Sequence, residues 1–346
     1  MTSKEYVGCA FTQKVLKFGK MMTNLGHEVI HYGHEDSNLV CSEHVAVVGR
    51  DEFHKAYGDC DWRSGPVRYS ARDSVYQAFY KNSIREIEKR RQKNDFILAF
   101  WGRGVKPICD AHQKHSIVVE PGIGYSNGHW AFFKVFESYA LMHAYWGLKM
   151  VEKCSPKWYE VVIPNYFDLD DFEYQRKKKS FVLFLGRVYE GKGIHIAQSA
   201  TKEAGLKLVV AGQKPQDVAF ESHVEFVGFA DSSKRRELLR DAMALIAPSM
   251  YVEPFGGVQI EALLSGTPTI TTDWGAFAEN NINGLTGYRC RTHGDFVQAL
   301  RNVRFIDSLD CRKHGIGFSL ENVGPMYEKY FKDVLNIYNG NGWYQL

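Results

Sequence analysis

The sequence lacks long apolar runs and has no large surplus of charge of either sign. Its 43 Lys and Arg residues and 40 Asp and Glu residues leave a net charge of +3 over 346 residues. This balance neither requires nor excludes nucleic acid as a partner. No apolar run reaches bilayer-spanning length, and the opening stretch MTSKEYVGCAF has no signal-peptide layout. We therefore expect a cytoplasmic protein and leave open a peripheral contact with a membrane surface.

The cysteines lack the spacing of a disulfide or zinc framework. Seven are scattered along the chain without a CxxC pair: Cys9, Cys41, Cys60, Cys109, Cys154, Cys290 and Cys311. An odd number at irregular spacing favours reduced thiols. The remaining composition, 45% hydrophobic and 14% aromatic, is typical of a folded protein. A chain of this length predicts two domains.

Short apolar segments alternate with helical stretches through the first half. Strands are expected at YVGCAF, GHEVIHYG, HVAVVG, DFILAF and SIVVEPG. Helices are expected from Gln13 to Leu25, at YQAFYKNSIREIEKRRQK and at AFFKVFESYALMHAYWG. This alternation predicts a parallel, doubly wound sheet.

The second half repeats this architecture after a polar connector, YEVVIPNYFDLDDFEYQRKKKS. Its strands are expected at SFVLFLG, LKLVVAG, VEFVGF, ALIAPS and TPTITT. We therefore predict an α/β protein with two Rossmann-like, doubly wound domains, residues 1–165 and 166–325, facing a central cleft. Residues 326–346 form a terminal helix expected to pack back on the N-terminal domain. Its apolar stripe consists of Phe331, Val334, Leu335 and Tyr338.

A glycine-rich loop joins a strand to a helix in FVLFLGRVYEGKGIHIAQSA, residues 181–200. Two cations, Arg187 and Lys192, lie in this loop next to the expected helix start, and this arrangement suits a diphosphate. The loop nearly matches the P-loop, but Gly193 stands where that motif needs a hydroxyl residue for magnesium. Ordinary surface cations are the alternative interpretation.

Two glutamates flank a second glycine loop in EPFGGVQIEALLSGTPTI, residues 253–270. Gly256 and Gly257 allow the backbone to approach a ligand closely. A helix is expected to begin near Val258, which places Glu261 in about its first turn. Glu253 and Glu261 could therefore contact one ligand at two places, as pairs of sugar hydroxyls require.

These motifs resemble those of the retaining glycosyltransferases of family 4, which have the two-domain GT-B fold. The Glu-x7-Glu signature followed by Gly-Thr-Pro resembles the family signature, and GRVYEGKG resembles its Gly-Arg loop with a downstream lysine. VIPNYFDLDDF and TDWGAFAENNINGLTG resemble the family's interdomain segment and its Gly and Glu loop. The resemblance is dense over residues 161–290. In the first half only NLGHEVIHYG resembles the family, and the glycine pair after the first strand is absent.

The resemblance implies a role for each matching residue of the second half. Arg187 and Lys192 would neutralise the diphosphate of a UDP- or GDP-sugar. Glu253 would bind the donor sugar, and Glu261 would hold the ribose hydroxyls. The other donor-binding positions would be Gly186, Gly212, Gly228, Phe229, Phe255, Gly256, Gly257 and Val258. The implied enzyme is a retaining hexosyltransferase that needs no metal and no cofactor beyond its nucleotide-sugar cosubstrate.

The acceptor side matches the family less well. Around the loop GIGYSNG, the acceptor-side candidates are Glu120, Gly122, Tyr125 and His129. Either Glu120 or His129 would take the place of a histidine that many family members carry. The resemblance favours a saccharide or lipid-linked acceptor. A modified base in DNA is the alternative substrate, and a non-catalytic sugar-nucleotide-binding partner protein is the alternative of another class.

Two further patterns have both a structural and a functional interpretation. The basic helix NSIREIEKRRQK is either a solvated face or a surface for an anionic acceptor. Asp59-Cys60-Asp61 and Asp168-Leu169-Asp170 resemble the metal-binding DxD motif of the other glycosyltransferase fold. We expect solvated loop carboxylates at both places.

Overall fold

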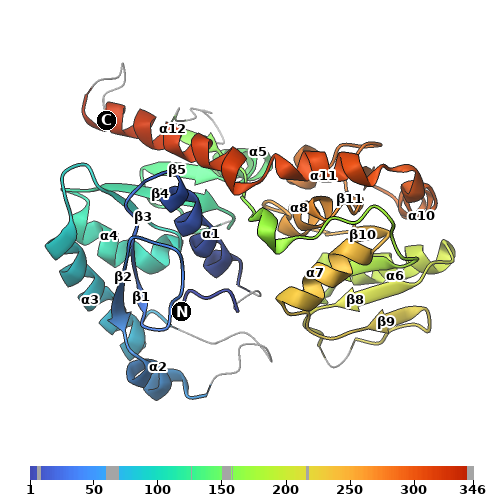
Figure 1. Ribbon diagram of the computed structural model, residues 1–346, viewed down its shortest axis with the longest axis horizontal. Helices are drawn as coiled ribbons and strands as arrows, with labels where there is room; N and C mark the ends of the chain where they lie inside the picture. Colours follow the sequence, from blue (N-terminus) through green and yellow to red (C-terminus); the bar gives the residue numbers. More distant parts are fainter. Residues whose placement is uncertain are drawn as a thin grey trace. The chain divides into compact units, whose positions relative to one another are not determined.

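The chain folds into two compact units, and Figure 1 traces their elements. The computed structural model describes residues 1–5, 9–59, 70–125, 127–149, 157, 159–215 and 218–340. Unit 1 comprises Met1–Glu137, Trp146–Pro164 and Val323–Leu346, and unit 2 comprises Ser138–Tyr145 and Asn165–Asn322. The segment Ser138–Tyr145, expected in the N-terminal domain, thus belongs to unit 2. Each unit is described by itself.

Several sequence expectations lie wholly or partly outside the described residues. They concern the strand YVGCAF at its first three residues, Cys60 and Asp61 of the first DxD-like motif, and Cys154. The last residues of YVGCAF belong to a helix, because α1 begins at Ala10. The described cysteines are free thiols: Cys9, Cys41, Cys109, Cys290 and Cys311.

Unit 2 contains a sheet of six parallel strands. They are β7 Val182–Leu185, β8 Leu208–Ala211, β9 Val224–Phe226, β10 Ala244–Ala247, β11 Thr269–Thr272 and β12 Gly287–Cys290. Their order in space is β12-β11-β10-β7-β8-β9. The chain therefore builds outward from β7 in one direction and then returns to add β10 on the other side. This is the doubly wound order, and the direction reverses between β7 and β10.

Helices cover both faces of this sheet. They are α6 Ile194–Glu203, α7 Ser232–Asp241, α8 Gly257–Leu264, α9 Phe277–Asn280, α10 His293–Asn302 and α11 Ser308–Ile316. Alternate residues of β7 point to opposite faces, as the two-residue period of a strand requires. Val182 and Phe184 pack with α6 and α10, whereas Leu183 and Leu185 pack with α7 and α8. Four apolar residues in a row thus indicate a strand that is buried on both faces.

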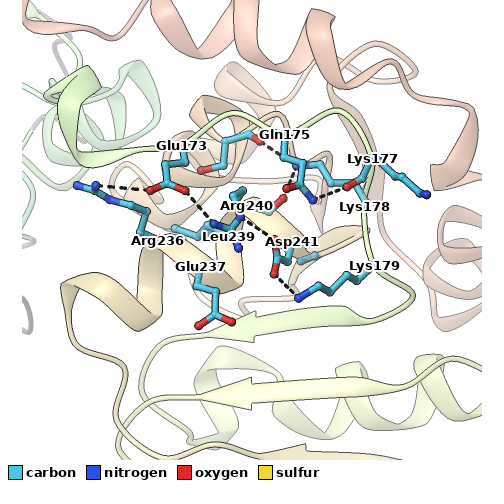
Figure 2. Close-up of polar contacts among 12 residues, drawn as sticks. Glu173, Gln175, Lys177, Lys178, Lys179, Arg236, Glu237, Leu239, Arg240 and Asp241 are labelled. Atoms are coloured by element: carbon cyan, nitrogen blue, oxygen red, sulfur yellow. Dashed lines mark hydrogen bonds and ion pairs between the residues drawn. The ribbon is translucent and has the colours of Figure 1, made fainter.

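The connector into unit 2 contacts the C-terminal ends of α7 and α8, and Figure 2 shows its contacts with α7. It contains the short 3-10 helix η2, Leu169–Asp171. Lys178 Nζ donates to the backbone oxygens of Arg240 and Ser265, both at 2.8 Å. Arg240 also pairs with Glu173 at 2.9 Å, and Lys179 pairs with Asp241 at 2.6 Å. The cation of Lys178 therefore caps two helix C-termini, where the helix dipole favours positive charge.

Unit 1 contains a four-stranded parallel sheet and a separate two-stranded one. The strands are β3 Phe96–Leu98, β4 Ile117–Ile123, β5 Phe133–Phe136 and β6 Glu160–Val162, in that spatial order, and the pair β1 Ile30–His34 and β2 Glu43–Val48. The described helices are α1 Ala10–Asn24, α2 Arg50–Tyr57, α3 Ser74–Arg90, η1 Gly102–Val105 and α4 Lys106–His112. The expected helix AFFKVFESYALMHAYWG is wrong in its first part, which forms β5. The helix α5 begins only at Tyr139 and ends at Lys149.

The last long helix, α12 Leu320–Tyr338, packs in unit 1 from Val323 onward. Tyr330 Oη donates to the backbone oxygen of Tyr159 at 2.9 Å. The buried face consists of Val323, Tyr327, Tyr330, Val334 and Ile337. Tyr338, which we expected on this face, is 38% exposed. Within the described residues, no helix is both long and apolar enough to span a membrane.

Candidate functional site

The loops after β7 and β10 meet at the point where the strand order of unit 2 reverses. Met250 N donates to Gly191 O at 2.9 Å. Gly193, between the 3-10 helix η3 Glu190–Lys192 and α6, has φ +70°, and a Cβ there would lie 2.1 Å from Pro248 O. Only glycine combines this backbone conformation with such a close approach. Open α/β sheets bind ligands at this reversal point, outside the carboxyl ends of the strands.

A partly buried ion pair joins the two loops. Lys192 Nζ pairs with Glu253 Oε1, and Ser249 Oγ donates to the same oxygen at 2.6 Å. Glu253 is 6% exposed, whereas the Lys192 side chain is 23% exposed. The Lys192 ammonium also lies 4.9 Å from the ring centre of Tyr251. Lys192, predicted to bind the diphosphate, and Glu253, predicted to bind the sugar, are thus in direct contact with each other.

Tyr251 carries a neutral hydroxyl beside this pair. Burial, followed by the charge of Glu253 and hydrogen bonds to Glu253 and Tyr189, raises the pKa of Tyr251 far above its ordinary range. A phenol that stays protonated can donate a hydrogen bond at any pH the protein meets. The sequence does not identify Tyr251 as a site residue, because a tyrosine in an apolar stretch is equally compatible with a role in core packing.

Arg187 presents a cation to solvent at the end of β7. Its guanidinium lies 5.6 Å from the ring centre of Tyr189, and the residue is exposed. Among the described residues, no carboxylate pairs with it. A phosphate oxygen would supply the missing charge without first displacing a protein carboxylate.

Three glycines lie next to one another along the carboxyl ends of β7, β8 and β9. Gly212 N donates to Gly228 O at 2.8 Å, and a Cβ on Gly212 would lie 1.9 Å from Gly186 O. All three residues have positive φ values, +148° for Gly186, +147° for Gly212 and +76° for Gly228. Phe229 follows and is partly buried. The three glycines predicted to bind the donor therefore form one continuous stretch of backbone along this edge of the sheet.

The second glycine loop leads into α8. Gly256 has φ +75°, and a Cβ on it would lie 2.3 Å from the Phe277 ring, while Gly257 is the first residue of the helix. Phe255 is 2% exposed and stacks on Phe167, so its side chain belongs to the core. Val258, the second residue of α8, is partly buried and packs against the core between α7, α8 and the sheet.

Glu261 lies close to the position that the sequence predicts, as the fifth residue of α8. It is in the second turn of α8, because that helix begins at Gly257 and has no acidic residue in its first turn. Its carboxylate accepts from Arg235 Nε at 2.7 Å. Arg235 was not predicted as a site residue, since α7 carries three further cations and one sequence does not distinguish them.

The acceptor-side candidates come together within unit 1. Glu120 is fully buried and accepts from Tyr125 Oη at 3.0 Å and from the backbone N–H groups of Trp130 and Ala131, both at 2.9 Å. His129 Nε2 lies 2.7 Å from Tyr125 O. Burial raises the pKa of Glu120, and its hydrogen bonds oppose this shift. The cluster ties the loop to β4.

Gly122 of β4 borders a second buried pair. Lys14 Nζ donates to Gly122 O at 2.8 Å and pairs with Glu137. Gly122 has φ +63°, and Gly124 leaves room for the Glu137 carboxylate, since a Cβ there would lie 2.6 Å from it. The glycines of GIGYSNG thus accommodate a buried charge pair.

The basic helix and the second DxD-like motif have structural partners. In α3, Glu86 pairs with Arg85, Lys89 and Arg90, and Glu88 pairs with Arg91. Asp168 Oδ1 accepts from Asp170 N at 3.3 Å and caps η2. Within the described residues, no group of three or more metal-ligating side chains could hold a metal ion.

Comparison with known proteins identifies a family that is similar to part of this chain. Residues 167–304 match the family model of glycosyl transferases group 1. The glycogen synthase of Mycobacterium tuberculosis is 36% identical over 138 residues, which cover 35% of this chain and 33% of that protein. The chain thus spans about a third of the length of this curated relative.

Solved structures extend the similarity beyond the matched segment. AviGT4, a glycosyltransferase involved in avilamycin A biosynthesis, superposes with a TM-score of 0.66 and 20% identity over 96% of this chain and 93% of its own. Anabaena HepE in complex with UDP and glucose gives 0.60 and 16% over 75% of this chain and 83% of its own. The predicted fold class, α/β with two Rossmann-like domains of GT-B type, is confirmed. The chain thus has the GT-B fold, and its segment 167–304 is similar to the glycosyl transferases of group 1.

Proposed function

We propose that the protein is a retaining glycosyltransferase of family 4 that moves a sugar from a nucleotide sugar to an acceptor hydroxyl. The observation that carries this proposal is the Lys192–Glu253 pair, which joins the β7 and β10 loops at the strand-order reversal. Both loops lie inside the segment that matches the glycosyltransferase family model. A cation and a carboxylate at this place support a site for a diphosphate and its attached sugar.

The chemistry follows from where charge develops. As the bond between the sugar and the diphosphate breaks, negative charge grows on the leaving oxygen. Lys192 and Arg187 would stabilise that charge because both cations are already held at the ends of β7 and η3. Glu253 would accept hydrogen bonds from sugar hydroxyls and so fix the reacting carbon.

Retention would need no protein nucleophile in this proposal. The acceptor hydroxyl would attack from the face that the phosphate leaves, and the departing phosphate oxygen would take its proton. Positioning and electrostatic stabilisation then supply the rate. We further propose that no metal is required, since two cations occupy the role that a metal ion has in other phosphate sites. A chelator should leave activity nearly intact, and a complete loss would refute this part.

For the donor we favour a UDP-sugar over a GDP-sugar, because the similar HepE structure contains UDP and glucose. For the acceptor we favour a saccharide, in keeping with the glycogen synthase match, and keep a lipid-linked acceptor second. A DNA acceptor has less support because carboxylates pair with four cations of the basic segment, Arg85, Lys89 and Arg90 of α3 and the following Arg91. A non-catalytic nucleotide-sugar binder is the alternative that turnover would exclude. The cytoplasmic location and any peripheral membrane contact stay predictions.

The proposal is tested by donor binding and turnover in one variant pair. Lys192→Ala removes the loop cation. The control, Lys207→Ala, removes an exposed lysine that lies just before β8 and pairs with Glu225 at 2.6 Å. We expect UDP at about a hundredfold its dissociation constant to stabilise wild type and Lys207→Ala by about 2.7 kcal/mol. Lys192→Ala should lose most of this stabilisation and nearly all transfer. Equal stabilisation in both variants would refute the assignment of the diphosphate site.

A further inference from the structure

One arginine of unit 2 contacts the carboxylate that we propose for the ribose. Arg235 is the fourth residue of α7, and Glu261 is the fifth residue of α8. Each therefore lies about one helical turn from the N-terminal end of its helix, near the carboxyl edge of the sheet. Arg235 Nε donates to Glu261 Oε2 at 2.7 Å, and Nη2 donates to the same oxygen. The side chains are 27% and 17% exposed, so a ligand can reach the pair.

The pair is asymmetric, and this asymmetry leaves polar groups for a ligand. In a two-pronged arginine–carboxylate pair each oxygen takes one donor. Here both nitrogens donate to Oε2 of Glu261. Within the described part of the chain, Oε1 of Glu261 accepts no hydrogen bond and Nη1 of Arg235 donates none. A free acceptor and a free donor on one ion pair match a sugar cis-diol, in which each hydroxyl can both donate and accept.

We propose that Arg235 is a specificity-determining residue of the donor site, which fixes Glu261 and hydrogen-bonds the ribose cis-diol of the nucleotide. This inference rests on the proposed function. In this arrangement Glu261 Oε1 accepts from one ribose hydroxyl, and Arg235 Nη1 donates to the other. Discrimination between ribose and deoxyribose then depends on both side chains.

Charge provides an independent reason for an arginine at this place. Glu261 is an anion in a site proposed for a diphosphate, and like charges oppose binding. Arg235 compensates the charge of Glu261 through the ion pair. Partly exposed ion pairs contribute little to stability. Ligand recognition therefore accounts for the pair better than stabilisation of the fold does.

The next residue along α7 offers a matched control. Arg236 donates to the backbone oxygens of Asp170 at 2.9 Å and Asp171 at 3.0 Å, and it lies 3.8 Å from Glu173. Figure 2 shows its side chain directed toward Glu173 of the connector. Arg236 therefore carries the same charge as Arg235 and lies on the same helix, but it has different hydrogen-bond partners.

The experiment measures the affinities of UDP and 2′-deoxy-UDP by calorimetry for wild type, Arg235→Gln, Arg235→Lys and Arg236→Gln. Wild type and Arg236→Gln should prefer UDP by about tenfold, the effect of one hydrogen bond to a charged group. Arg235→Gln should bind UDP more weakly and reduce the preference to about twofold or less. Arg235→Lys keeps the charge without the planar fork, so it should recover part of the UDP affinity but not the full preference.

Thermal unfolding without ligand shows whether each variant is folded. If Arg235→Gln does not fold, Arg235→Lys takes its place in the comparison. An unchanged preference for UDP in both Arg235 variants would overturn the inference and leave Arg235 as a structural residue. A wild type that binds UDP and 2′-deoxy-UDP equally would also overturn it, while the proposed diphosphate site stands. A wild type that binds neither would overturn the proposed function and this inference with it.

Discussion

Two glycines at opposite ends of α6 provide a sharp test of how the β7 and β10 loops are held together. Gly193 precedes the helix with φ +70°, and Gly205 follows it with φ +69°. A Cβ at Gly193 would lie 2.1 Å from Pro248 O, whereas at Gly205 nothing lies within 4 Å. The two alanine variants therefore share the backbone penalty and differ only in the collision.

The magnitudes follow from these two terms. An alanine with left-handed backbone costs about 1–2 kcal/mol, and about 0.4–1 kcal/mol is regained because the unfolded chain loses freedom. Gly205→Ala should thus lower the free energy of unfolding by about 1 kcal/mol. In Gly193→Ala the β10 loop must also move by roughly 1 Å to restore a normal contact, at a further cost of about 1–3 kcal/mol. We expect a total of about 2–4 kcal/mol.

Thermal unfolding and donor binding together check this reasoning. For a domain of this size Tm should fall by about 3 °C in Gly205→Ala and by about 6–12 °C in Gly193→Ala. Only Gly193→Ala should also weaken UDP binding, because Pro248 precedes Ser249 and Glu253 in the displaced loop. Equal Tm losses would show that the collision relaxes at no cost. Equal UDP affinity would show that the loop contact does not position the site.

Three further predictions concern stability. Burial and the neighbouring His44 lower the pKa of His31 to about 3. Because His31 in the unfolded chain takes up a proton below about pH 6.5, the free energy of unfolding of unit 1 should fall by about 2 kcal/mol between pH 6.5 and pH 5. Urea titrations of His31→Gln should show a smaller fall. Glu279 accepts from two N–H groups at the start of α5, so Glu279→Gln should cost about 0.5–2 kcal/mol in thermal unfolding. Lys178→Met should cost about 2–3 kcal/mol at pH 7 because it leaves carbonyl oxygens without a donor. Burial lowers the pKa of Lys178 to about 8, so wild type, but not this variant, should gain stability as pH rises from 8 to 10.

The sequence predicts the centre of the unit 2 sheet well because β7, β8 and β10 are apolar and buried on both faces. Four or five consecutive apolar residues between glycine or polar turns leave little choice but a central parallel strand. The same rule misplaced β5. AFFKVFESYALMHAYWG is apolar throughout, and periodicity alone does not separate a strand followed by a helix from one long helix. The turn at Glu137 is set by the pair with Lys14, which lies more than a hundred residues earlier.

On the donor side, the motifs locate loops but not side-chain pairs. Glycines at positive φ mark the loops, and these positions are visible in the sequence because other residues strain there. Whether Glu253 contacts Lys192, or Glu261 contacts Arg235, depends on the β10–β7 pairing and on the packing of α7 against α8. Those are long-range contacts, so residue types alone do not determine them.

On the acceptor side, the candidates were selected for their chemistry, and the structure shows that one of them, Glu120, is buried and hydrogen-bonded within unit 1. Glu120 looks like a reactive carboxylate because it follows a strand and precedes a glycine loop. In the structure three donors, from Tyr125, Trp130 and Ala131, already bind its two oxygens. A carboxylate that is buried and satisfied in this way holds the loop in place, since losing any donor would leave a charge without compensation. A carboxylate that binds a substrate needs an oxygen that is still available, as Oε1 of Glu261 is within the described residues. The available Oε1 therefore supports the proposed role of Glu261 in ligand binding, whereas both oxygens of Glu120 already have donors.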